Sequence, residues 1–411
     1  MPAPTKIYFP QIAVGWEDWV QIVNVGDEPA NIVAVARDQQ GQSIWSQAIK
    51  LNAFQAFTTA ADTITVPVSM TVSSNMPIVG ERHCHNKDTV VFNFPGASPD
   101  NMAVGNRIFF PEIYEGGLDW FQILNVSEQP TNINVIVRDK SGKVFKQFGV
   151  QNLGSFNWWN FTDGETGSIS GTVELMSTQP IAGERHLHYT VGHLGSATGQ
   201  LGQVIDRPSH RQYFPEISDA WNDWVQIVNV GNAPSKVTVV ARDQNGNAVW
   251  SQEATIQPFQ AWNPTVEQIK QQTSVTAISD QPILAERHAH SGTQLLNFPG
   301  ASRRNRCAGR RMFFPEIYSG GLDWFRFLNI SEDTCNIAII ARDRDGKVAK
   351  QLNSPPIPTM GWWIVTDTEI GNITGTLEAL CTQNTVGERH LHYAANVHKD
   401  VAVGQFGQVI D

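Results

Sequence analysis

The sequence contains few cysteines, and this limits the kinds of structure it can form. Cysteine occurs four times in 411 residues, and Cys84, Cys307, Cys335 and Cys381 occupy no repeated position. The sequence therefore predicts neither a disulfide framework nor a zinc knuckle. Cys335 and Cys381 could form a local disulfide, but two free thiols are the preferred interpretation.

Long apolar runs are missing as well. No stretch approaches the roughly 20 residues that a membrane-spanning helix requires, so no membrane span is predicted. Met1–Lys6 lacks the charged and apolar regions of a secretory signal. The chain is therefore expected to stay in the cytoplasm, to leave the cell by another route, or to lack a signal that the natural protein has.

Charge is sparse and has no basic concentration. Charged residues make up 17% of the chain and hydrophobic residues 41%, which is typical of a folded globular protein with a weakly charged surface. The net charge is -10, and the only basic stretches are Arg303–Arg306 and Arg310–Arg311. Because a phosphate-binding surface needs a clustered basic face, nucleic acid is not an expected partner.

Catalytic motifs are also missing from the sequence. It contains no glycine-rich phosphate loop, no Gly-x-Ser-x-Gly elbow and no His-Glu-x-x-His helix. We therefore predict that the protein is not an enzyme and has no cofactor other than a conceivable metal ion.

Histidine, in contrast, is concentrated in one repeated motif. Eight of the eleven histidines lie in four copies of Glu-Arg-His-x-His, which begin at Glu81, Glu184, Glu286 and Glu388. The copies are spaced by 103, 102 and 102 residues, and the surrounding sequence repeats with them. The chain is therefore four homologous units.

The four units alternate between two types. Units one and three share Trp16 and Trp221, whereas units two and four carry the paired tryptophans Trp158-Trp159 and Trp362-Trp363. The order is A-B-A′-B′, a duplicated pair, with predicted domains 1–105, 106–208, 209–309 and 310–411. Short links between them predict a rod or a compact pseudo-symmetric ring.

Strand signals dominate each unit. About seven short β-rich segments alternate with turn residues, such as the Gly41 that follows Arg37-Asp38. A turn at Asn75–Pro77 is expected just before the histidine strand. Helical periodicity is limited to Val266–Gln272. The pattern predicts an all-β protein of four tandem immunoglobulin-like antiparallel β-sandwiches.

These repeated residues resemble a known group of proteins. The order Phe-Pro, Asp-Trp-x-Gln-Ile, Ala-Arg-Asp and Pro-Ile-x-x-Glu-Arg, with Ser177–Arg185 and Gly192-His193 as one example, resembles tandem β-sandwich repeats of bacterial cell-surface proteins. More remotely, the unit is similar to the sensory-rhodopsin-transducer domain. The resemblance implies a non-enzymatic surface or interaction module.

The histidine motif offers metal ligands on one face of a strand. Side chains at i, i+2 and i+4 of a strand point the same way, so Glu81, His83 and His85 share a face opposite Arg82 and Cys84. The candidate ligand sets are Glu81, His83, His85; Glu184, His186, His188; Glu286, His288, His290; and Glu388, His390, His392. Adjacent same-face residues are roughly 6.5–7 Å apart, so a ligand from another strand is needed. The preferred interpretation is a structural polar row; a pH-sensitive contact between units is a further alternative.

Tryptophans supply the other candidate sites. The Asp-Trp tryptophan, at one fixed place in every unit, is expected in the core. Trp16 and Trp221 occur only in units one and three and are candidates for sugar stacking or partner contact. In Trp158-Trp159 and Trp362-Trp363, one ring of each pair must face away from the core, which suggests an interface with another unit.

We therefore predict a structural or adhesive protein that associates with itself or with other surface proteins, forming a filament, sheath or array. The first alternative is a multivalent lectin that binds glycans, and the second is a metal-binding or signal-transducing protein. The resemblance favours an extracellular or cell-surface location, with the cytoplasm as the alternative.

Overall fold

The computed structural model describes residues 5–12, 15–60, 64–86, 90–190, 196–206, 208–292, 294–393 and 401–410. Gly192 and His193, which contributed to the resemblance, lie outside these residues. The described chain is built almost entirely of antiparallel strands, which confirms the all-β fold class.

The strands fall into four groups that repeat along the chain, here called units 1 to 4. Unit 1 contains β1 (Lys6–Ile12), β2 (Glu17–Asn24), β3 (Ala30–Arg37), β4 (Ser43–Leu51), β5 (Ala56–Ala60), β6 (Val68–Ser74), β7 (Ile78–Asn86) and β8 (Val90–Pro95). Unit 2 contains β9 (Val104–Ile113), β10 (Gly117–Asn125), β11 (Thr131–Asp139), β12 (Val144–Leu153), β13 (Trp158–Thr162), α1 (Asp163–Thr166), β14 (Gly171–Tyr189), β15 (Ala197–Leu201) and β16 (Gln203–Val204). Unit 3 contains β17 (Ser209–Ile217), β18 (Asn222–Asn229), β19 (Ser235–Arg242), β20 (Ala248–Ile256), β21 (Ala261–Trp262), the 3₁₀ helix η2 (Val266–Gln268), β22 (Thr273–Ser291) and β23 (Gln294–Pro299). Unit 4 contains β24 (Ala308–Ile317), β25 (Gly321–Asn329), β26 (Ile337–Asp343), β27 (Val348–Asn353), β28 (Trp362–Thr366), α2 (Asp367–Ile370), β29 (Gly375–Tyr393), β30 (Ala402–Phe406) and β31 (Gln408–Val409).

Each unit is a two-layered sandwich. In unit 1 the layers are β1-β6-β3-β4 and β5-β2-β7-β8. The predicted turn at Asn75–Pro77 separates β6 from β7 there. In the other units one long strand, β14, β22 or β29, runs through both layers instead.

Alternating side chains fill the space between the layers. In β3, Ala30, Ile32 and Ala34 are buried, whereas Asn31 and Val33 are exposed, as expected of a half-buried strand. Each unit has one such apolar core.

Helical structure is minor. The predicted helical segment Val266–Gln272 forms only the single turn η2. The short helices α1 and α2 were not predicted, although each follows a Thr-x-x-Glu capping box, Thr162 with Glu165 and Thr366 with Glu369.

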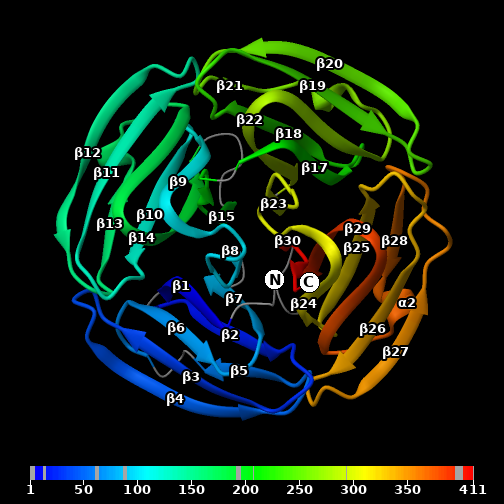
Figure 1. Ribbon diagram of the computed structural model, residues 1–411, viewed down its shortest axis with the longest axis horizontal. Helices are drawn as coiled ribbons and strands as arrows, with labels where there is room; N and C mark the ends of the chain where they lie inside the picture. Colours follow the sequence, from blue (N-terminus) through cyan, green and yellow to red (C-terminus); the bar gives the residue numbers. More distant parts are fainter. Residues whose placement is uncertain are drawn as a thin grey trace.

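The four units form a closed ring, one of the two arrangements that the short links predicted (Figure 1). Strands β8, β15, β23 and β30 surround the centre, and β4, β12, β20 and β27 lie on the outer rim. Apolar clusters join every pair of neighbouring units, including unit 4 with unit 1 through Phe313 and Val79. Because these clusters tie the units together, the boundaries of independently folding domains stay a prediction.

Candidate functional site

The strand that carries the histidine motif lies between two neighbouring units. In β7, Glu81 and His83 contact residues of unit 4, whereas Arg82 contacts unit 2. The predicted alternation of faces is therefore present, and both faces are buried. Each motif therefore contacts both the preceding and the following unit.

The four motif arginines form a closed circle of ion pairs. Each arginine Nε binds the aspartate of the Asp-Trp pair in its own unit, at 2.6–2.7 Å. Each Nη1 binds the motif glutamate of the next unit: Arg82 with Glu184, Arg185 with Glu286, Arg287 with Glu388, and Arg389 with Glu81. The last pair joins the C-terminal unit to the N-terminal one.

This circle is almost completely removed from water. The arginines and motif glutamates are at most 1% exposed. Burying a charge is costly, so such groups persist only when partners with good geometry compensate them. The circle therefore fixes how the four units sit around the centre.

The interfaces between units are of two kinds. We call the interfaces of unit 1 with 2 and of unit 3 with 4 the A–B interfaces. The interfaces of unit 2 with 3 and of unit 4 with 1 are the B–A interfaces.

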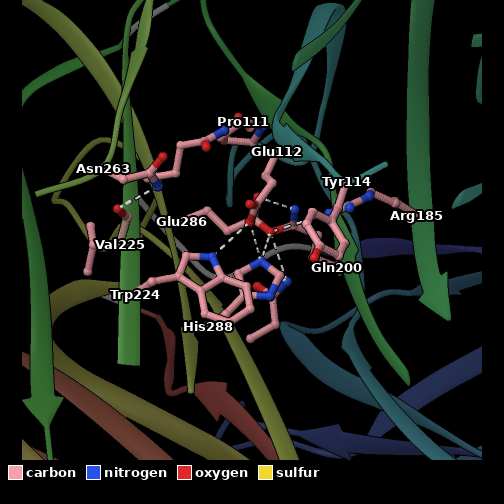
Figure 2. Close-up of polar contacts among 12 residues, drawn as sticks. Pro111, Glu112, Tyr114, Arg185, Gln200, Trp224, Val225, Asn263, Glu286 and His288 are labelled. Carbon is pink, nitrogen blue, oxygen red and sulfur yellow. Dashed lines mark hydrogen bonds and ion pairs between the residues drawn. The ribbon is translucent and has the colours of Figure 1, made fainter. Parts of the chain in front are cut away.

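At the B–A interfaces, the first motif histidine lies between two carboxylates. His288 Nε2 is 2.5 Å from Glu286 of its own strand and 3.0 Å from Glu112 of unit 2 (Figure 2). The Tyr189 hydroxyl lies 3.2 Å from His288 Nδ1, and Trp224 Nε1 donates to Glu112. His83 has the same surroundings: Glu81, Glu316 and the Tyr393 hydroxyl.

The paired carboxylates make these histidines cationic. Burial alone would lower the pKa of His288, but the charges of Glu112 and Glu286 outweigh burial and raise the pKa to about 9. Glu316 and Glu81 likewise raise the pKa of His83 to about 9 against the effect of burial. Burial would raise the pKa of Glu112, but the charge of His288 lowers it to about 2.

At the A–B interfaces, aromatic rings surround the motif histidines. Phe92 and Phe94 of unit 1 pack on His186, with ring centroids at 4.4 and 5.4 Å. Gly199 faces Phe94 so closely that a Cβ would lie 2.3 Å from the ring, so glycine is required there; Gly404 faces Phe298 in the same way. Burial lowers the pKa of the second histidines, His188 and His392, to about 4.

Two substitutions distinguish the A–B interfaces further. In unit 1, Gln11 takes the place that Glu112, Glu216 and Glu316 hold in the other Phe-Pro segments. In unit 4, Arg326 replaces the glutamine of the Asp-Trp strand and lies 3.4 Å from Glu216. At the interface of units 1 and 2, an amide therefore replaces the second carboxylate near the histidine. At the interface of units 3 and 4, both carboxylates are present, and Arg326 adds a further cation beside Glu216.

Four of the six candidate tryptophans lie at the A–B interfaces. Trp16 and Trp221 are half-buried at the A–B interfaces, where Trp16 stacks on Phe92 and Trp221 meets the edge of His392. Trp158 and Trp362 are buried against the preceding unit. Trp159 and Trp363 pack on the core of their own unit.

The Asp-Trp tryptophans are not core residues, contrary to expectation. Each is paired across strands with the first motif histidine, such as Trp19 with His83. The Trp19 ring stacks on both His83 and His85, at 5.0 and 4.4 Å. Trp224 stacks on His288 and His290 in the same way. The tryptophan thus covers the polar row, because directly opposed side chains share one face of the sheet.

Three groups could place a cation between carboxylates. They are Glu81, His83 and Glu316; Glu112, Glu286 and His288; and Glu216, Glu388 and His390. The second histidines of the predicted ligand rows are not in these groups; His85, for example, contacts Tyr393. A proton on the imidazole supplies the same bridging charge as a metal ion would, and a pKa of about 9 for His83 and His288 means that this proton is bound at neutral pH.

A further contact between neighbouring units was not predicted from the sequence. The arginines of three of the four Arg-Asp turns reach the next unit: the Arg37 guanidinium lies 4.5 Å from the Phe156 ring centroid, Arg138 4.2 Å from that of Phe259, and Arg342 4.4 Å from that of Phe54. These phenylalanines all have positive φ, an uncommon backbone state for a bulky residue. Their repeated spacing after the Arg-Asp turn was the available signal.

Comparison with known proteins does not assign this chain to a family. No family model matches the chain, and no curated protein matches it. A Thermotoga maritima 1070 crystal structure is 17% identical over 24% of this chain and 96% of its own, with a TM-score of 0.22. The Anabaena sensory rhodopsin transducer is 17% identical over 19% of this chain and 92% of its own, with a TM-score of 0.17. These likenesses extend only to a β-rich fold. Among the described residues, no helix has the length and apolarity to cross a membrane.

Proposed function

We propose that this chain is a non-enzymatic structural protein, a rigid ring that associates with other copies of itself through the strand edges on its rim. The polar residues that could have formed a reactive centre are instead buried in ion pairs between units. This use of the motif supports a structural role.

The observation that carries the proposal is the set of edge strands. Among the described strands, β4, β12, β20 and β27 each pair on one side only, and all four lie on the rim (Figure 1). Exposed apolar side chains lie near the start of each of these strands: Ile44, Val144 and Phe145, Val249, and Val348. An edge with free N–H and C=O groups and exposed apolar residues is a template for pairing with another chain.

A location at a bacterial cell surface is part of the proposal and rests on the motif resemblance alone. The paired tryptophans are not part of the proposed contact between copies, because Trp158 and Trp362 pack between units of one chain and Trp159 and Trp363 pack on the core of their own unit. Copies of the ring are the proposed partner, since the same edge recurs four times around one molecule.

Negative-stain electron microscopy over a range of concentrations tests this proposal. Filaments or sheets are expected from the unaltered protein, and an Ile44→Lys, Phe145→Lys variant should assemble less. Val33→Lys is the matched control, because Val33 is exposed on a sheet face rather than on a rim strand. Single rings at every concentration would contradict the proposal.

A further inference from the structure

A cavity of about 120 Å³ lies at the centre of the ring and is lined by residues of all four units. The exposed Arg304 lines it as well, so the cavity reaches the surface. A cavity of this size holds several water molecules, or a small organic molecule.

The wall of the cavity carries buried amide side chains whose carbonyl oxygens have no hydrogen-bond partner. Each is at most 8% exposed. They are Asn93, Gln200, Gln203, Gln212, Asn297 and Gln405. Buried polar atoms without a partner are uncommon in folded proteins, and each needs a cause.

The protein itself fixes which way these amides point. Gln203 Nε2 donates to the Ala285 carbonyl at 3.1 Å, and Gln212 Nε2 donates to the Ile283 carbonyl at 2.8 Å. The NH₂ groups of Gln200 and Asn297 donate to the Glu286 carboxylate. Exchanging O and N would place two acceptors together, so the carbonyl oxygens stay turned away from these anchors.

We infer that the central cavity is a binding site for a neutral, hydroxyl-rich molecule, a sugar or a sugar alcohol. Such a ligand presents several O–H donors, and its C–H faces can pack on Pro95 and Pro299, which also line the cavity. Arg304 and Arg306 also line the cavity, but Asp100 lines it too, 4.0 Å from Arg306, and Glu81 and Glu286 lie behind the amides, so the lining does not favour an anion. A single bare cation is too small to contact acceptors spread over this volume.

This site is independent of the rim and of the proposed self-association. It also places sugar binding elsewhere than Trp16 and Trp221, whose rings contact His188 and His392 of the next unit. The alternating A and B units give the cavity approximate twofold repetition, with Asn93 and Asn297, or Gln200 and Gln405, at equivalent places.

Isothermal titration with glucose, mannose, galactose, N-acetylglucosamine and sorbitol tests the inference, with inorganic phosphate and putrescine as the anionic and cationic probes. At least one sugar or sorbitol is expected to bind. A Gln203→Met, Gln212→Met variant should bind it about tenfold more weakly, the loss of one or two hydrogen bonds. Gln351→Met is the matched control, because Gln351 is exposed on β27.

A crystal structure of the unaltered protein with the best ligand covers the case in which the double variant does not fold; the ligand should touch Gln203 and Gln212. The inference is overturned if no sugar or sorbitol binds more tightly than about 10 mM. It is also overturned if phosphate or putrescine binds instead, or if the ligand lies outside the cavity.

Discussion

The A–B and B–A interfaces use one motif in two ways. At the A–B interfaces the arginine–glutamate distance is 2.6–2.7 Å, and at the B–A interfaces it is 3.4 Å. The B–A glutamates also bind a histidine that carries charge, and a glutamine of the neighbouring unit. The same Glu-Arg-His therefore makes the shorter arginine pair at the A–B interfaces, and its glutamate shares its charge with an imidazolium at the B–A interfaces.

The largest effect is expected from breaking the arginine circle. Arg287→Met leaves Asp223 and Glu388 buried without their cation, which should lower the free energy of unfolding by about 3–5 kcal/mol. Arg185→Met, at a B–A interface, should cost less, because its bond to Glu286 is longer. Urea unfolding measures both.

The control for these variants is Lys236→Met, which removes an ion pair between side chains that are more than half exposed. It should leave the unfolding midpoint unchanged within error. Equal losses from Arg185→Met and Arg287→Met would contradict the distinction between the two interfaces.

Glu112→Gln should make the interface of units 2 and 3 resemble that of units 1 and 2, where Gln11 occupies the equivalent position. Removing one carboxylate should bring the pKa of His288 down from about 9, and the loss of a charged hydrogen bond should cost about 1.5–3 kcal/mol near neutral pH. NMR titration of the imidazole and urea unfolding measure the two effects. Glu115→Gln, at an exposed position in the same unit, should change neither.

The two interfaces should also respond oppositely to pH. His83 and His288 have folded pKa values raised from 6.5 to about 9, so their stabilisation is complete below about 6.5 and is lost as pH rises through about 9. His188 and His392 have folded pKa values lowered to about 4, so stability falls as pH drops from about 6.5 toward 4. Unfolding midpoints across this range should peak between the two windows. A midpoint that keeps rising above pH 7 would argue against bound imidazolium.

The smallest effect on stability is expected from removing an aromatic ring at an A–B interface. Trp16→Ala removes a half-buried ring that stacks on Phe92, which should cost about 1–2 kcal/mol. Thermal unfolding measures the change, and Trp221→Ala should behave alike. If a sugar stabilised the unaltered protein but not Trp16→Ala, the ring would have a ligand-binding role rather than a packing role.

The sequence pattern predicted much of the fold. Period-two alternation and repeated turn residues indicated the sandwich, and the 102–103-residue spacing indicated the four units. Alternation also placed Glu81 and His83 opposite Arg82. What it could not show was that both faces of this strand are covered by other units, because Glu184 and Glu316 lie far away in the sequence.

The tryptophans also show what the sequence pattern alone could not predict. The Asp-Trp tryptophan was expected in the core because buried aromatic residues are common in sandwiches. Its position opposite the histidine became clear only with the strand register, which pairs Trp19 with His83. Metal binding stays a prediction. In three of the four predicted rows the first two residues lie close to a third group, a carboxylate from the Phe-Pro-Glu segment of another unit, which the sequence pattern did not indicate.

The most direct test of the account is the charge state of four histidines in the intact protein, read from the ring ¹⁵N shifts by NMR. The account predicts that His83 and His288 are imidazolium near pH 8, whereas His188 and His392 are still neutral near pH 5.5. Neutral rings at His83 and His288 near pH 7 would contradict it, because two buried carboxylates would then face each imidazole without a proton between them.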